Sequence, residues 1–207
     1  TSDPHMARLN DFELLIVRHG IAESYHDQGD AARQLTDVGE QRIKRVLPTW
    51  LSMDWHWNVA LTSPYARAKR TSEIIQQGLY ERYLETHMMK IPEALVDDQL
   101  VPHGDLDQAL FRILDVGRIL AGPRPRVAVF SHNPLVSRLA SKLVCGDEHG
   151  QFSFGTGDML HLFIPAPSHF DLVLSPQKKE PLPRAVVLGF YPADAQIAMS
   201  EGAALKL

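Results

Sequence analysis

The sequence predicts an α/β fold, a three-layer sandwich with a mostly parallel central sheet and helices on both of its faces. Short apolar runs typical of buried strands occur at 14–17, 59–62 and 127–130. A segment with helically spaced apolar residues follows each run before the next strand begins. Strands that alternate with helices in this way pair side by side in parallel and bury both faces of the sheet.

In the first half of the chain, the strand 14–17 is followed by a polar segment, 21–34, which predicts a loop. Thr36 is placed to cap a helix that starts at Asp37. Pro48 lies inside the apolar pattern of this helix, so we expect the helix to kink or end there. The second strand, 59–62, leads through Ser63-Pro64 into a helix expected over 65–79.

In the second half, apolar spacing and turn residues predict five further elements and an optional sixth. They are a helix at 105–120, the strand 127–130, a helix at 134–144 that ends at Gly146, a hairpin of strands at 159–164 and 170–174, and an added strand at 186–188. The stretch after Ser175 is rich in proline and charge and predicts an exposed linker.

Length and composition place the chain among ordinary globular proteins. Its 207 residues suit one domain, and 44% hydrophobic with 22% charged residues is a typical composition. We expect residues 1–5 to be an expression scar, 6–175 to form the domain, and 176–207 to be an extension packed on that domain. A net charge of −4 favours neither nucleic acid nor an anionic membrane as a partner. The single cysteine, Cys145, and the lack of an apolar run of spanning length predict a cytoplasmic protein.

Arginine and histidine residues, which can bind or attack a phosphoryl group, follow the ends of the predicted strands. Arg18-His19-Gly20 follows the strand 14–17, and His132 in Ser131-His132-Asn133-Pro134 follows the strand 127–130. Arg67 lies one turn into the helix after Ser63-Pro64. The carboxyl ends of parallel strands meet at one edge, where open α/β sheets bind their ligands. We therefore expect two arginines and two histidines to meet there.

This set of residue types indicates phosphoryl transfer. Arginine grips two phosphate oxygens with its planar fork and stays charged. A neutral histidine can attack phosphorus, and a second histidine, if protonated, can donate to the same oxygens. Each residue alone has a plainer interpretation, since strand-end arginines often form surface ion pairs and a lone histidine is more often structural. Their joint occurrence at three strand–helix junctions favours the catalytic interpretation.

Four ordered motifs make the chain similar to the histidine phosphatase (phosphoglycerate mutase-like) superfamily. They are Leu15-Ile16-Val17-Arg18-His19-Gly20, Gln34-Leu35-Thr36-Asp37-Val38-Gly39, Thr62-Ser63-Pro64-Tyr65-Ala66-Arg67-Ala68 and Ser131-His132-Asn133-Pro134-Leu135-Val136. The resemblance covers about residues 13 to 176. Within the superfamily the chain most resembles the small SixA-type phosphohistidine phosphatases, through Ala22-Glu23, Pro102-His103-Gly104-Asp105 and 152–160.

The resemblance implies a metal-independent phosphatase without a cofactor. Its implied catalytic residues are His19 as nucleophile, Arg18 and Arg67 on the phosphoryl oxygens, His132 completing the pocket, and Asp105 as proton donor. Gly20 would let the backbone approach the phosphate closely and would fix the tautomer of the histidine. Asn133 would be a further phosphate-binding residue. Asp107 and His103 remain alternative donors, and Asp105 has the plainer interpretation of a helix cap.

One departure from the family pattern bears on the substrate. Ile21-Ala22 follows Arg-His-Gly where many mutases and broad phosphatases carry Glu-Ser. Arg67 and His132 stand only 65 positions apart, so only a short cap region fits between them and we expect a shallow, open site. The resemblance then implies removal of phosphate from a protein phosphohistidine, such as a histidine-phosphotransfer domain. A phosphomonoesterase acting on a small phosphate ester and a phosphate-binding adaptor without turnover are the alternatives.

Overall fold

A computed structural model describes residues 9–85, 90–167 and 182–204. Its centre is a six-stranded sheet in the order β3-β2-β4-β1-β5-β6. The first four strands of this order pair in parallel, and β5 and β6 pair antiparallel, so the sheet is mixed with a parallel majority. The predicted α/β class is confirmed.

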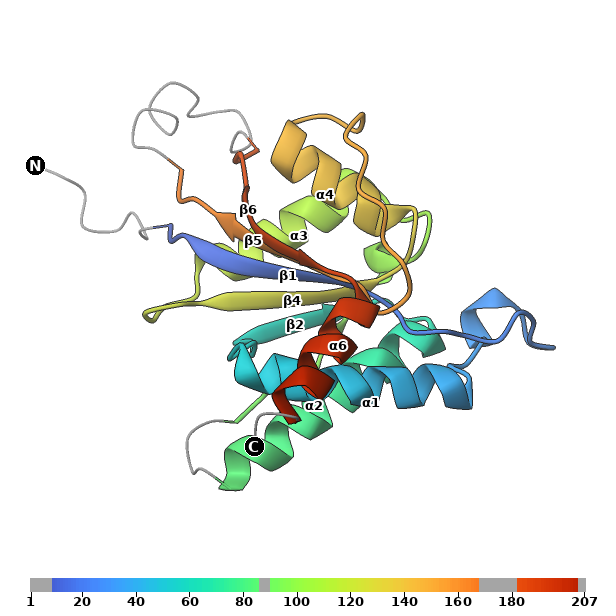
Figure 1. Cartoon of the computed structure of the whole chain (residues 1–207). Coiled ribbons are helices and arrows are strands. Elements are labelled where there is room, and N and C mark those ends of the chain that lie inside the picture. The colour runs from blue at the N-terminus through green and yellow to red at the C-terminus, as the bar shows by residue number, and fades with distance from the viewer. Residues whose placement is uncertain (1–8, 86–89, 168–181, 205–207) are drawn as a thin grey trace, which may run out of the picture.

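The strands alternate with helices along most of the chain (Figure 1). The strands are β1 (Phe12–Arg18), β2 (Val59–Thr62), β3 (Leu95–Val96), β4 (Arg126–Ser131), β5 (Met159–Ile164) and β6 (Val186–Tyr191). The α-helices are α1 (Asp37–Ser52), α2 (Ala66–Glu85), α3 (Leu106–Arg118), α4 (Leu135–Cys145) and α6 (Ala193–Ala204). Two short 3-10 turns, η1 (Asp30–Ala32) and η2 (Asp98–Leu100), lie in the connections.

Helices cover both faces of the sheet and enclose two cores (Figure 1). On one face, α3 and α4 pack apolar side chains such as Leu110 and Leu139 against Leu14 and Val127. On the other face, α1, α2 and α6 bury Trp50, Ile75 and Ile197 against the alternate residues of the same strands. Successive strand side chains point to opposite faces, so fully buried strands read as continuous apolar runs.

The register of the parallel strands aligns their carboxyl ends. Arg18 pairs with Ser131 across β1 and β4, and Thr62 pairs with Phe130 across β2 and β4. The segments that follow these three strands therefore begin at one edge of the sheet. The sequence predicted that the candidate phosphate-binding residues would meet at this edge.

Several helix ends follow the predicted signals. The Thr36 side chain accepts a hydrogen bond from the Gly39 backbone at the start of α1. Gly146 closes α4 in the left-handed conformation, with φ 82°. Pro48 does not end α1, which continues to Ser52, so the first of the two expected effects, a kink, stays a prediction and the second, an end at the proline, is wrong. Thr49 and Trp50 hydrogen-bond to Gln196 of α6, and these tertiary contacts hold the last turn in place beyond the proline.

The late elements differ from the prediction in one respect. The strand at 159–164 is confirmed as β5, and its antiparallel neighbour is β6, which includes the residues expected at 186–188. The other expected hairpin strand, 170–174, lies outside the described residues. Helix α6 was not anticipated from the sequence, and it packs against α1.

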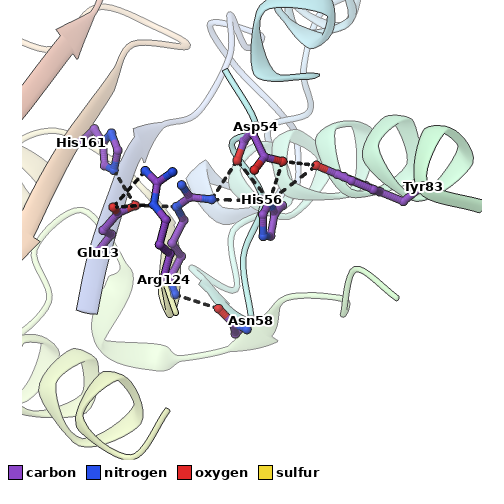
Figure 2. Close-up of polar contacts among 8 residues, drawn as sticks. Glu13, Asp54, His56, Asn58, Tyr83, Arg124 and His161 are labelled. Atoms are coloured by element: carbon purple, nitrogen blue, oxygen red, sulfur yellow. Dashed lines mark hydrogen bonds and ion pairs between the residues drawn. The ribbon is translucent and has the colours of Figure 1, made fainter. Parts of the chain in front are cut away.

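At the opposite end of the parallel strands, charged side chains form a network around the largely buried Glu13 (Figure 2). Its carboxylate accepts from Arg126 Nε at 2.5 Å and Arg124 Nη2 at 3.2 Å, and lies 3.0 Å from His161 Nε2. Arg126 also donates to the Asp54 carbonyl at 2.8 Å. This network links the connection between α1 and β2 to the start of β4. The neighbouring residues that take part are Asp54, His56, Asn58 and Tyr83.

Among the described residues, no helix combines the length and apolar character that crossing a bilayer requires.

Candidate active site

Three strand ends deliver the candidate residues to one edge of the sheet. Arg18 is the last residue of β1, and His19 comes directly after it. Arg67 is the second residue of α2, which follows β2, and His132 comes directly after β4. The structure thus brings together the four residues that the sequence singled out. The His19 and His132 rings lie 5.0 Å apart, centroid to centroid.

His19 has one defined tautomer. Its Nδ1 lies 2.7 Å from the Gly20 carbonyl oxygen, which can only accept, so the ring proton sits on Nδ1. Nε2 therefore carries the lone pair. Gly20 itself is held by its N–H, which donates to Thr71 Oγ1 at 3.0 Å, and a Cβ there would come within 2.9 Å of Ile43.

Arg67 faces this lone pair. Its Nε lies 3.3 Å from His19 Nε2, and the side chain is only 4% exposed. Its two terminal nitrogens donate to Asp30, Nη1 to the backbone carbonyl at 2.7 Å and Nη2 to the carboxylate at 3.1 Å. The guanidinium carbon also lies 5.2 Å from the centre of the Tyr65 ring.

His132 is oriented by Ser63, the residue after β2. Ser63 Oγ lies 2.7 Å from His132 Nε2 and accepts from the Tyr65 backbone N–H at 3.2 Å. We take the Ser63 hydroxyl to donate to Nε2, which places the His132 proton on Nδ1. This Nδ1 is buried and has no hydrogen-bond partner in the described part of the chain.

Arg18 and Asn133 meet at one backbone oxygen. Arg18 Nη1 donates to the Phe154 carbonyl at 2.7 Å, and Asn133 Nδ2 donates to the same oxygen at 2.9 Å. Arg18 Nε is buried without a partner among the described residues. Buried donors without acceptors are costly, and two of them beside one histidine lone pair make an arrangement suited to an anion.

Both histidines are neutral at neutral pH. Burial, and then the charges of Arg67, Arg18 and Arg33, lower the pKa of His19 to about 4, although the Gly20 carbonyl opposes the shift. Burial is also the main cause that lowers the pKa of His132 to about 2, with the nearby His19 and Arg67 adding to it. The sequence analysis expected the second histidine to donate to phosphate oxygens if it were protonated. Because the His132 ring is neutral, we expect it to donate through its Nδ1 proton instead.

In the described part of the chain, the side chain of Asp105 serves as a helix cap. Its carboxylate accepts from the Gln108 backbone N–H at 2.9 Å and caps α3, the plainer of the two sequence interpretations. It lines a separate hollow of about 370 Å³ together with Arg138 and Lys142. Among the described residues, no hydrogen bond or ion pair joins Asp105 to His19, and the alternatives His103 and Asp107 are exposed.

A second hollow, of about 350 Å³, begins beside Asn133. It is lined by Ser137, Arg138, Gln151 and Phe152 among others, and it shares Asn133 with the candidate site. His19 is only 7% exposed, so its ring lies deeper than the expected shallow site implies.

Sequence reasoning missed two charged residues at the site, Asp30 and Arg33. It assigned 21–34 to an undifferentiated loop, yet Asp30 binds Arg67, and the charge of Arg33 acts on His19. The available signal was an acid and a base three residues apart just before the capped helix, which is the spacing of an ion pair on one helical turn. Thr71, which holds Gly20, carried no signal in the sequence.

The comparisons with known proteins agree with this geometry. A family model described as the histidine phosphatase superfamily (branch 1) matches residues 14–89. An uncharacterized protein of Picosynechococcus is 30% identical over 135 residues, which span 65% of this chain and 74% of that protein. The chain belongs to the histidine phosphatase superfamily.

Solved structures show the same fold. The protein histidine phosphatase SixA, solved with tungstate, matches with a TM-score of 0.66 at 20% identity, over 88% of this chain and 98% of that chain. A putative α-ribazole-5'-P phosphatase of Escherichia coli matches with a TM-score of 0.55 at 14% identity, over 74% and 90% of the two chains. The resemblance to SixA-type proteins noted in the sequence thus extends to the three-dimensional structure.

Proposed function

We propose that this protein is a phosphatase that removes phosphate from protein phosphohistidine through a phosphorylated His19. One observation carries the proposal: the neutral His19 Nε2 lone pair faces Arg67 Nε at 3.3 Å, beside the unpartnered donors Arg18 Nε and His132 Nδ1. A nucleophile surrounded by donors fits phosphoryl transfer, in which positioning and charge neutralisation dominate.

In the proposed first step, the His19 Nε2 lone pair attacks phosphorus. The bond from phosphorus to the leaving nitrogen breaks, and the leaving imidazole keeps that electron pair; because the substrate ring is protonated on its other nitrogen, it departs as a neutral imidazole. The Gly20 carbonyl holds the Nδ1 proton of His19 and stabilises the positive charge that develops on the ring. In the second step water attacks the phosphohistidine, which releases inorganic phosphate and restores the neutral ring.

The surrounding donors are proposed to hold the phosphoryl oxygens in both steps. Arg67 is placed to donate from Nε, Arg18 from its buried Nε, and His132 from Nδ1. Asn133 is proposed to act with Arg18, because both donate to the Phe154 carbonyl. Preorganised donors of this kind stabilise the charge that builds in the transition state.

Two features favour a protein substrate over a small ester. The part of the chain described between α2 and β4 holds only β3, η2 and α3, so little covers the edge of the site. The hollow beside Asn133 offers room for a side chain carried on a larger surface. A small-molecule phosphomonoesterase is the second candidate, supported by the similarity to the putative α-ribazole-5'-P phosphatase.

The test is phosphate release from two substrates in parallel, a histidine-phosphorylated phosphotransfer domain and para-nitrophenyl phosphate. We expect faster release from the phosphohistidine, and we expect His19→Ala to abolish both activities because the nucleophile is removed. Turnover by His19→Ala within a few-fold of the unmodified protein would contradict the mechanism. Fast ester hydrolysis without phosphohistidine activity would favour the second candidate, and release from neither would favour an adaptor.

A further inference from the structure

Asp30 touches the candidate site through Arg67. Its carboxylate oxygen Oδ2 accepts from Arg67 Nη2 at 3.1 Å, and its backbone carbonyl accepts from Nη1 at 2.7 Å. The arginine side chain is 4% exposed, whereas the Asp30 side chain is 52% exposed. Asp30 therefore lies between the buried floor of the site and the solvent.

The contact uses the edge of the guanidinium that faces the nucleophile. Nε and Nη2 form one edge of an arginine, the edge that grips two oxygens of a phosphate side-on. Here Nε faces His19 Nε2 at 3.3 Å and Nη2 holds the Asp30 carboxylate. A phosphoryl group bonded to His19 Nε2 would present an oxygen to this same edge. The Asp30 carboxylate therefore occupies a position that a phosphoryl oxygen would use.

Charge makes the two anions exclusive. The hydrogen bond from Arg33, followed by that from Arg67, holds the pKa of Asp30 below its ordinary value, so the group is ionised at neutral pH. A phosphoryl dianion and an ionised carboxylate repel each other strongly at hydrogen-bond distance in a partly buried site. One of them has to leave Arg67 when the other binds.

The surroundings of Asp30 allow the carboxylate to leave. The 3-10 turn that it opens is three residues long and follows Gly29, which has a φ of 97°. Arg33 Nη1 holds the other carboxylate oxygen at 2.7 Å, and Arg33 Nε is anchored on the Glu23 carbonyl. An outward rotation therefore keeps one ion pair, and the Asp30 carbonyl still orients Arg67 through Nη1.

We propose that Asp30 is a specificity-determining residue, an internal anion that occupies the Arg67 side of the phosphoryl site and competes with oxyanions for it. The inference rests on the proposed function, since it takes the phosphoryl site to lie at His19 and Arg67. The competition weakens the binding of free inorganic phosphate, which has no other contacts. A phosphorylated protein surface makes further contacts that offset the weaker binding of its phosphoryl group, so the competition favours large substrates. Free phosphate makes no such contacts, so the competition also speeds product release.

The experiment measures oxyanion binding by calorimetry, with inorganic phosphate and tungstate as probes. Asp30→Asn keeps the shape and removes the charge, while Asp27→Asn removes an exposed carboxylate from the same loop and serves as the matched control. We expect Asp30→Asn to lower the Kd of both probes about fivefold, the scale set by a half-exposed ion pair that competes for one site. Asp27→Asn should stay within about twofold of the unmodified protein, since its charge lies away from Arg67.

Asp30→Ala is the second variant, with the melting temperature measured to confirm that both variants fold. It should tighten binding as Asp30→Asn does. An unchanged Kd, or no binding by any variant, would overturn the proposal, and weaker binding would assign Asp30 to positioning Arg67 instead. The readout is independent of turnover: tighter binding without hydrolysis of any substrate contradicts the proposed function and leaves the competition standing.

Discussion

At the scale of single residues, burial decides which form of His19 is present. The ring is 7% exposed, and the nearest formal charges are those of Arg67 and Arg18, so a proton added to Nε2 would be both desolvated and repelled. The His19 lone pair is thereby available at neutral pH without a general base to remove a proton. The Gly20 carbonyl selects which nitrogen carries the lone pair.

This environment predicts the pH dependence of the nucleophile. Because the pKa of His19 is lowered to about 4, Nε2 keeps its lone pair down to about pH 4 instead of losing it near the ordinary value of about 6.5. We expect the ring signals of His19, assigned by comparison with His19→Ala, to titrate in NMR spectra with a midpoint near pH 4. After correction for the ionisation of the substrate, kcat/KM should stay flat between pH 7 and about 5. A midpoint near 6.5 would contradict the inferred environment.

The proton donor is also a question at the residue scale, and Asp105 is the residue that the family resemblance proposes. Asn caps a helix about as well as Asp, so Asp105→Asn removes the acid and keeps the α3 cap. If Asp105 protonates the leaving group, kcat for an alkyl phosphate should fall roughly 100-fold, the usual scale of general acid catalysis. Phosphohistidine and para-nitrophenyl phosphate have better leaving groups and should change little. If Asp105→Asn matches the unmodified protein in rate on all three substrates, the only role of Asp105 is to cap α3.

At the scale of elements, the strands were predictable because each is a continuous apolar run buried on both faces. The site was predictable for the same reason, since parallel strands of known direction deliver their carboxyl ends to one edge. Asp30 was not predictable, because its contact with Arg67 joins positions 37 apart and leaves no local pattern. Helix α6 was missed because it is built largely from small and polar residues, and its place depends on the buried side chains of Gln196 and Ile197.

Between elements, the network around Glu13 joins β1, β4 and β5 at the end of the strands opposite the site. Burial opposes the charge of Glu13, but hydrogen bonds from Arg126 and His161 outweigh it and hold the pKa of this carboxyl below its ordinary value. A carboxylate with a lowered pKa stabilises the fold above its unfolded-state pKa, and this contribution is lost as the pH falls through the folded-state pKa.

Glu13→Gln should therefore destabilise the protein. Arg126 is 1% exposed and would lose its charged partner, which costs roughly 3 kcal/mol, or about 6–12 °C in melting temperature at this chain length. The difference from the unmodified protein should shrink as the pH falls below the ordinary value of 4.5 and through the lowered pKa of Glu13 in the folded protein. Glu148→Gln, which removes the exposed pair with Arg138, is the matched control and should cost under about 1 kcal/mol. Equal losses in both variants would contradict a special role for the buried network.

At the scale of the whole molecule, the chain's last helix is connected to the candidate site through Gln196. This side chain is fully buried, accepts from Trp50 Nε1 at 2.9 Å, and donates to the carbonyls of Tyr191 and Gly157. The Gly157 N–H in turn donates to the carbonyls of Arg18 and His19. We infer from this chain of contacts that the C-terminal extension and the preceding domain unfold as one unit.

Gln196→Ala tests this inference. The variant leaves the Trp50 N–H and the Tyr191 carbonyl without their partner in a buried position, which should cost roughly 2–4 kcal/mol. If the extension and the domain are one cooperative unit, the variant shows a single transition at lower temperature, and hydrogen exchange increases in β1 and β4 as well as in α6. Gln77→Ala, on the exposed face of α2, should leave both measurements unchanged. Faster exchange confined to 193–204, with the domain transition unmoved, would show that the extension opens on its own, and the contacts of Gly157 with Arg18 and His19 would then be independent of α6.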